Sequence, residues 1–112
     1  MTIRQLQDYL KAKDHRPAKK PDYILKFMEE SGELAKAILN NYPHAQGDEI
    51  KNTIEEEFCD VLYYLCALAN LYDVDIEKWF PVKARKADEK YSPGFFDAHF
   101  PAQPQEAFPQ ND

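Results

Sequence analysis

The sequence predicts an all-α protein, with four main helices packed as a bundle-type protomer in a single domain, residues 1–112. Apolar residues recur at helical spacing through most of the chain, and no segment of any length has the two-residue period of a strand. The chain has 112 residues, of which 44% are hydrophobic and 30% charged. This composition suits a folded domain, and the length is too short for two ordinary ones.

The expected helices, in chain order, cover residues 2–13, 22–40, 48–72 and 76–91, so the helical core runs from about 22 to 91. Thr2 can cap the first helix, and Pro21 suits the start of the second, where a missing N–H costs nothing. Asp48 or a neighbour marks the start of the third helix. Asp73 and Asp75 supply the turn and cap before the fourth helix.

Both central helices have an apolar face. In the second helix this face comprises Ile24, Phe27, Met28, Ala35, Ile38 and Leu39, and in the third it comprises Ile50, Ile54, Phe58, Val61, Leu65, Leu68 and Tyr72. A second apolar side of the third helix comprises Leu62, Tyr63, Cys66 and Ala69. Such a side predicts a self-complementary helix pair, most simply a two-fold homodimer.

Three segments depart from regular helix. Residues 11–20 form a basic connector, and Pro81 predicts a kink or a fresh start in the fourth helix. The tail, residues 92–112, is rich in proline and phenylalanine. Its aromatic residues favour a strap lying on a surface, although the last dozen residues could equally be loose.

Charge and composition exclude several functions. The net charge is −6, which disfavours partners such as nucleic-acid polymers and anionic membranes. The chain has only 3 glycines, and they form no phosphate-binding glycine-rich loop. No apolar run resembles a signal peptide or a membrane span, so we expect a soluble, cytoplasmic protein.

Two acidic clusters carry the strongest chemical signal. Each contains a carboxylate pair three residues apart, Glu30 with Glu33 and Glu57 with Asp60. Residues at this spacing are neighbours on a helix, where two carboxylates repel each other unless a cation lies between them. Mg²⁺ prefers such oxygen ligands, with Mn²⁺ as an alternative ion. The other interpretation is a solvated acidic face, which we favour for Glu29, Glu55 and Glu56 on spacing alone.

Other reactive residues are less suggestive. The three histidines are isolated, and none forms the Glu-x-x-His pair of a di-iron bundle. Ser31 and Cys59 have no obvious histidine base, so a nucleophilic triad is not expected. Basic residues gather on the fourth helix, at Lys83, Arg85, Lys86 and Lys90. They form either a solvated face near a helix end or a patch that neutralises phosphates.

The segments KFMEESGELAKAI and EEEFCDVLYYLCALAN resemble the MazG-like all-α nucleoside triphosphate pyrophosphohydrolases. That family carries E-x-x-E on one helix and E-x-x-D on the next, which correspond here to Glu30, Glu33, Glu57 and Asp60. The similarity covers about residues 22–91. In the family's later helix, Lys83 and Lys90-Tyr91 fit the pattern, whereas Ala87 stands where an asparagine is usual.

The resemblance implies a Mg²⁺-dependent enzyme that cleaves a nucleoside triphosphate between the α- and β-phosphates, in a house-cleaning role. It implies that the four acids bind metal, that Glu29 or Glu56 takes the proton of the attacking water, and that Lys83 and Lys86 meet the triphosphate. It also implies a homodimer or a tetramer of two dimers. Two alternatives are a non-catalytic helical association module and an enzyme for another nucleotide, such as phosphoribosyl-ATP.

Overall fold

A computed structural model of the protein describes residues 1–101. Its elements are α1 (Ile3–Lys13), the 3₁₀ helix η1 (Pro17–Lys19), α2 (Lys20–Leu39), α3 (Ile54–Leu71), α4 (Ile76–Tyr91) and α5 (Phe95–His99). Over these residues there is no strand, only an isolated bridge between Gln46 and Glu49, and the predicted all-α class is confirmed. None of these helices is both long and apolar enough to cross a membrane. The chain divides into two compact units, Met1–Glu77 and Lys78–Asp112.

The first two helices begin where the sequence predicts. The Thr2 hydroxyl accepts a hydrogen bond from the Gln5 backbone N–H at 3.0 Å, and the Gln5 side chain accepts one from the Thr2 N–H at 2.8 Å. This reciprocal capping box satisfies two donors at the start of α1. In α2, Pro21 lies in the first turn and Asp22 follows it, so the missing N–H and the negative charge both suit the helix start.

The third helix begins later than predicted, at Ile54 rather than near Asp48. Gly47 and Asn52 have φ angles of 61° and 62°, which a right-handed helix does not contain. Thr53 is the N-cap instead, because its hydroxyl accepts a hydrogen bond from the Glu56 N–H at 3.3 Å. Ile50 therefore belongs to a loop and is not part of the apolar face of α3.

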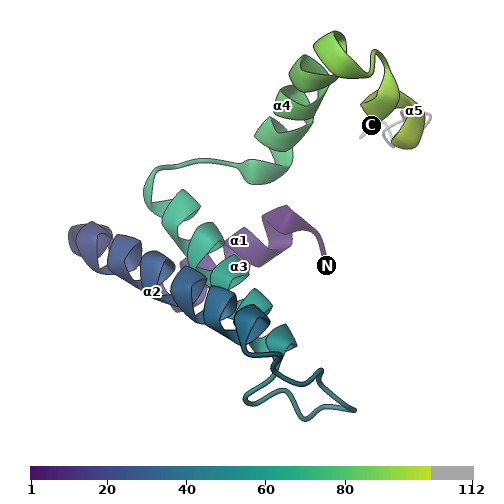
Figure 1. The fold of residues 1–112 in the computed structure, drawn as a ribbon. Helices are drawn as coiled ribbons and strands as arrows, with labels where there is room; N and C mark the ends of the chain where they lie inside the picture. Colours follow the sequence, from purple (N-terminus) through teal and green to yellow (C-terminus); the bar gives the residue numbers. More distant parts are fainter. Residues whose placement is uncertain (102–112) are drawn as a thin grey trace, which may run out of the picture. The chain divides into compact units, whose positions relative to one another are not determined.

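The core of the first unit lies between α2 and α3, which run antiparallel and side by side (Figure 1). Tyr23 from α2 packs with Ala67 and Leu71 from α3, and Tyr64 and Leu68 border this cluster. Several members of the predicted apolar faces are exposed in the single chain: Ile24, Met28, Ile38, Leu39, Phe58, Leu65 and Tyr72. Both helices are apolar on more than one side, and periodicity alone does not say which side is buried.

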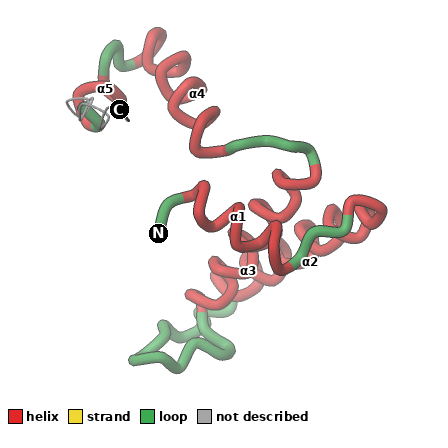
Figure 2. Tube along the Cα trace, turned by 180° about the vertical axis from the view of Figure 1, so that it is seen from behind, coloured by secondary structure: helices red, strands yellow, loops and turns green. Residues whose placement is uncertain are grey.

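Helix α1 packs across α3 on the other side (Figure 2). A buried amide pair joins them: the Gln7 side chain donates to the Asn70 Oδ1 at 3.1 Å, and the Asn70 amide donates to the Gln7 backbone carbonyl at 2.8 Å. Cys66, expected on a free second side of α3, is buried within the unit, whereas Leu62 is exposed. The amide pair fixes where α1 crosses α3, because leaving either amide unpaired inside the core would be costly.

Asp14, just after α1, connects all three helices of this unit. Its carboxylate accepts one hydrogen bond from the Tyr23 hydroxyl of α2 and another from the Tyr63 hydroxyl of α3, the latter at 2.8 Å. The Tyr23 hydrogen bond, followed by that from Tyr63, lowers the pKa of Asp14 against the opposing effect of burial. Burial of Tyr63 and its hydrogen bond to Asp14 raise the pKa of Tyr63. Both hydroxyls act as donors to a charged acceptor.

In the second unit, α4 continues through Pro81, so a fresh helix start there is wrong. Residues of the predicted strap form the short helix α5, which contacts α4. The Phe96 N–H donates to the Asp88 carboxylate at 2.7 Å, and Arg85 pairs with Asp97 at 2.8 Å. The Arg85 guanidinium also lies 4.9 Å from the centre of the Phe96 ring. The rest of the predicted tail, residues 102–112, lies outside the described residues.

Replacing Tyr63 by phenylalanine removes one of the two donors to Asp14 and little volume. We expect the free energy of unfolding, measured by urea denaturation, to fall by about 1 kcal/mol. Tyr72→Phe is the matched control, since Tyr72 is exposed at the end of the same helix. Equal stability of Tyr63→Phe and the wild type would show that Asp14 does not hold α3.

Candidate active site

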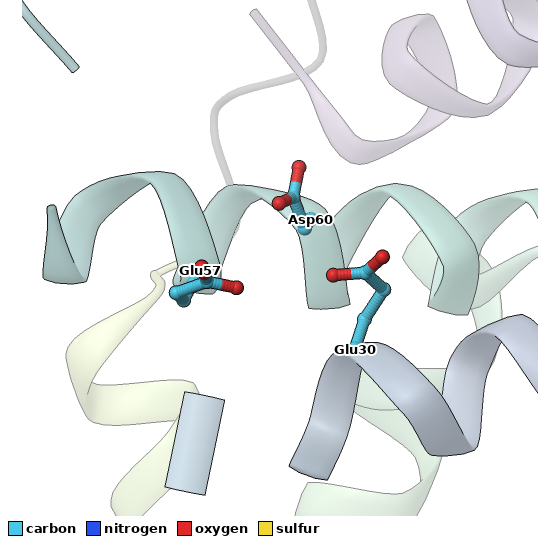
Figure 3. A group of neighbouring side chains, drawn as sticks. All are labelled: Glu30, Glu57 and Asp60. Carbon is cyan, nitrogen blue, oxygen red and sulfur yellow. The ribbon is translucent and has the colours of Figure 1, made fainter. Parts of the chain in front are cut away.

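Three carboxylates from two helices come together in the first unit. Glu57 and Asp60 lie one turn apart on α3, and Glu30 reaches toward them from α2 (Figure 3). Each offers one oxygen, and these three oxygens lie within 4.8 Å of one another. The antiparallel packing of α2 on α3 produces this group, because it sets the middle of one helix against the first half of the other.

The environment of the three carboxylates disfavours their charged forms. All three are half-buried. Desolvation is the main cause that raises the pKa of each group above its ordinary value. Neighbouring charge adds to it: Asp60 acts on Glu30 and on Glu57, and Glu56 acts on Asp60. A bound cation would reverse this balance, since each repelling carboxylate would become a ligand.

Glu33, the fourth predicted ligand, lies one turn after Glu30 and is exposed. It is not among the three residues whose oxygens meet. Its charge nevertheless contributes to the raised pKa of Glu57, which places it near the group.

The remaining acids of the two clusters have other partners. Glu29 forms an ion pair with Lys26 at 3.4 Å, and the Glu56 carboxylate accepts a hydrogen bond from the Asn52 N–H at 3.3 Å, next to the N-cap of α3. Glu55 contacts His44 at 2.6 Å and accepts from the Ala45 N–H at 2.8 Å. The hydrogen bond with His44 is the main cause that lowers the pKa of Glu55, and the one from Ala45 adds to it. Glu55 therefore closes the loop before α3 and takes no part in the acidic group.

Lys83 and Lys86, the predicted phosphate contacts, are exposed on α4 in the second unit. Sequence reasoning missed a different cation, Lys26, which lies one turn before Glu30 in α2. It lines a cavity of about 390 Å³ together with Arg16, Asp22, Tyr23, Leu25, Glu29 and Tyr64. The available signal was spacing, because Lys26 precedes Glu30 by one helical turn and Tyr64 follows Asp60 by one.

The donor set fits a hard divalent cation. The three residues whose oxygens come together, Glu30, Glu57 and Asp60, offer carboxylate oxygens and include no cysteine or histidine. Mg²⁺ is bound through a few carboxylates and keeps water molecules that a phosphate can replace, so three or four acids are sufficient. Soft metals, which prefer thiolate, do not match these ligands.

Comparison with known proteins agrees with this geometry. Residues 19–95 match the model of the MazG nucleotide pyrophosphohydrolase domain. The chain belongs to the MazG family. Two crystal structures of iMazG from Vibrio DAT 722 are similar to this chain, the Ctag form at 37% identity and the Ntag form at 38%. Their TM-scores are 0.73 and 0.74, and the matches cover 79% and 82% of this chain and 99% of each iMazG chain.

The comparison with curated proteins gave no match. The MazG membership confirms the predicted family, and the protein is a nucleotide pyrophosphohydrolase, a hydrolase acting on phosphoric anhydrides. The two acidic helices, α2 and α3, both lie within the matched residues.

The raised pKa values make a prediction about stability and pH. An acid whose pKa is higher in the folded state holds more protons there, so its repulsion appears as pH rises through the window between its unfolded and folded pKa values. At neutral pH, millimolar Mg²⁺ should therefore raise the melting temperature by linkage. The shift should shrink as the pH falls through these raised pKa values, because protons then neutralise the group. Melting curves with and without Mg²⁺ across this range measure it.

Asp60→Asn tests the origin of that effect. It should stabilise the metal-free protein at pH 7, because one repelling charge is lost, and it should reduce the Mg²⁺ shift. Asp8→Asn, at an exposed position on α1, is the control and should keep the full shift. If Mg²⁺ protected both variants equally, the ion would bind elsewhere.

Proposed function

We propose that this MazG protein hydrolyses (deoxy)nucleoside triphosphates to a nucleoside monophosphate and pyrophosphate in a Mg²⁺-dependent reaction. The observation that carries the proposal is the convergence of Glu30, Glu57 and Asp60 within 4.8 Å. Glu33, one turn along α2, completes the proposed ligand set. When bound, Mg²⁺ would neutralise phosphate charge and lower the pKa of a coordinated water.

The residues of the chain then have defined tasks. Glu30, Glu33, Glu57 and Asp60 would hold the ion, which would supply positive charge to the phosphates. Water attacks the α-phosphorus. A P–O bond forms, the bond from the α-phosphorus to the bridging oxygen breaks, and pyrophosphate leaves with the electron pair. Glu29 or Glu56 accepts the proton of the water, since both adjoin the group without belonging to it. Lys83 and Lys86 contact the triphosphate. No covalent nucleophile is required.

A deoxynucleoside triphosphate is the proposed substrate, in a house-cleaning role in the cytoplasmic nucleotide pool. Support comes from the family and from the acidic group, which can bind phosphates through a metal ion where other enzymes bind them with a glycine-rich loop. Phosphoribosyl-ATP presents the same type of phosphate chain. A screen of canonical and modified triphosphates together with phosphoribosyl-ATP separates these substrates.

The bond that breaks can be tested with ¹⁸O-labelled water and mass spectrometry. We expect the label in the monophosphate, because attack is at the α-phosphorus. Asp60→Asn should lower kcat/KM by roughly 100-fold or more through loss of a charged ligand, whereas Asp8→Asn should not. Label in pyrophosphate alone would place attack at the β-phosphorus. Release of orthophosphate would contradict the proposed reaction altogether.

We also propose that the protein acts as a homodimer or as a tetramer of two dimers. An apolar stripe of residues three or four apart runs along an exposed side of α2 and comprises Ile24, Met28, Gly32, Ala35 and Leu39. A Cβ added at Gly32 would meet nothing within 4 Å. Glycine in a helix costs about 1 kcal/mol relative to alanine. Close approach of a second helix would offset that loss.

Light scattering at micromolar concentration should give two or four times the mass of one chain. Gly32→Leu should shift the protein toward the monomer, because a large side chain keeps the second helix away. Ala12→Leu, at an exposed position of α1, is the control. A wild-type monomer, or an unchanged mass for Gly32→Leu, would be evidence against pairing through α2.

A further inference from the structure

Lys26 lines the cavity and lies close enough to the acidic group for its charge to act on Glu30. It lies one turn before Glu30 on α2, which corresponds to about 6 Å along the helix. Its charge lowers the pKa of Glu30 against the rise caused by burial and by the other carboxylates. Tyr64, one turn after Asp60 on α3, lines the same cavity. Lys26 and Tyr64 therefore place this part of the cavity one helical turn from the acidic group along α2 and α3.

The cavity has room and chemistry for part of a nucleotide. Its volume is about 390 Å³, which lies within the range of ligand sites. Two cations line it, Arg16 and Lys26. The Arg16 guanidinium is engaged in the fold: its Nε donates to the Tyr23 hydroxyl at 3.4 Å and lies 3.6 Å from the Asp14 carboxylate. Lys26 is thus the cation better able to change partner.

The present partner of Lys26 is held weakly. The Nζ lies 3.4 Å from the Glu29 carboxylate, and the two side chains are 49% and 57% exposed. Ion pairs this exposed contribute little free energy, so a more highly charged anion can replace the carboxylate. A phosphate carries more charge than Glu29 and accepts several hydrogen bonds. Exchange of Glu29 for phosphate would also leave the Glu29 carboxylate free.

We propose that Lys26 is a phosphate-binding residue. Its ammonium leaves Glu29 and pairs with a phosphate of the nucleotide, and the nucleotide lies in this cavity beside the acidic group. The inference rests on the proposed function and adds a cation within the same unit as the carboxylates. Lys83 and Lys86, by contrast, belong to the second unit.

Three variants test the role of Lys26 in the full chain. Lys26→Met keeps the length of the stem and removes the charge, whereas Lys26→Arg keeps the charge. Lys36→Met makes the same change at an exposed position near the end of α2. Two readouts apply: kcat and KM with a triphosphate and Mg²⁺, and calorimetric affinity for each product, Mg²⁺-pyrophosphate and a deoxynucleoside monophosphate.

We expect Lys26→Met to raise KM about tenfold with a smaller change in kcat, and to weaken binding of one product about tenfold. Lys26→Arg should restore both values to within about threefold, and Lys36→Met should leave them unchanged. The product affected tells which side of the cleaved bond Lys26 contacts.

Three results would overturn the proposal. These are unchanged affinity for both products in Lys26→Met, an equal loss in Lys36→Met, or a fall in kcat alone, which would mean that Lys26 acts only through Glu29. The proposed function fails separately, if the wild type hydrolyses no triphosphate. In that case the calorimetric affinities for the two products still test whether Lys26 binds phosphate.

Discussion

The packing of α2 against α3 is the interaction on which the rest of the first unit depends. Tyr23, Ala67 and Leu71 form its core, and the small buried side chains of Ala37 and Ala67 allow the helices to approach closely. The distances from Glu30 to Glu57 and to Asp60 depend on the register of this pair, because Glu30 belongs to α2 and the other two residues to α3. A slip of one turn would displace Glu30 by about 5.4 Å and separate the group.

Five carboxylates of this unit have shifted pKa values, and they divide into two kinds. Asp14 and Glu55 accept hydrogen bonds from neighbouring groups, their pKa values are lowered, and each fixes a chain segment next to a helix end. Glu30, Glu57 and Asp60 lie within the helices, facing other carboxylates, and their pKa values are raised. The first kind stabilises the fold, whereas the second opposes it, as is common for groups kept for function.

The sequence predicted the fold class, three of the four acids expected to converge and the helix starts that have a strong local signal; Glu33 lies outside the three-residue group. Thr2 and Pro21 are such signals. The start of α3 was missed because Asp48 and Thr53 are both good capping residues, and only the positive φ angles at Gly47 and Asn52 decide between them. The faces buried within the single chain were only partly predicted, because α2 and α3 are apolar on several sides. Lys26 was missed because a lysine near glutamates resembles an ordinary surface ion pair.

The loop before α3 is closed at its base rather than at its tip. The Ile54 N–H donates to the Pro43 carbonyl at 3.1 Å, and the Glu55 carboxylate accepts from the Ala45 N–H at 2.8 Å. Residues 46–49 form the tip beyond this closure, whereas Ile50 and Asn52 bond to Thr53 and Glu56 at the start of α3. We therefore expect this tip to accept an inserted epitope or fluorescent label without displacement of Glu57.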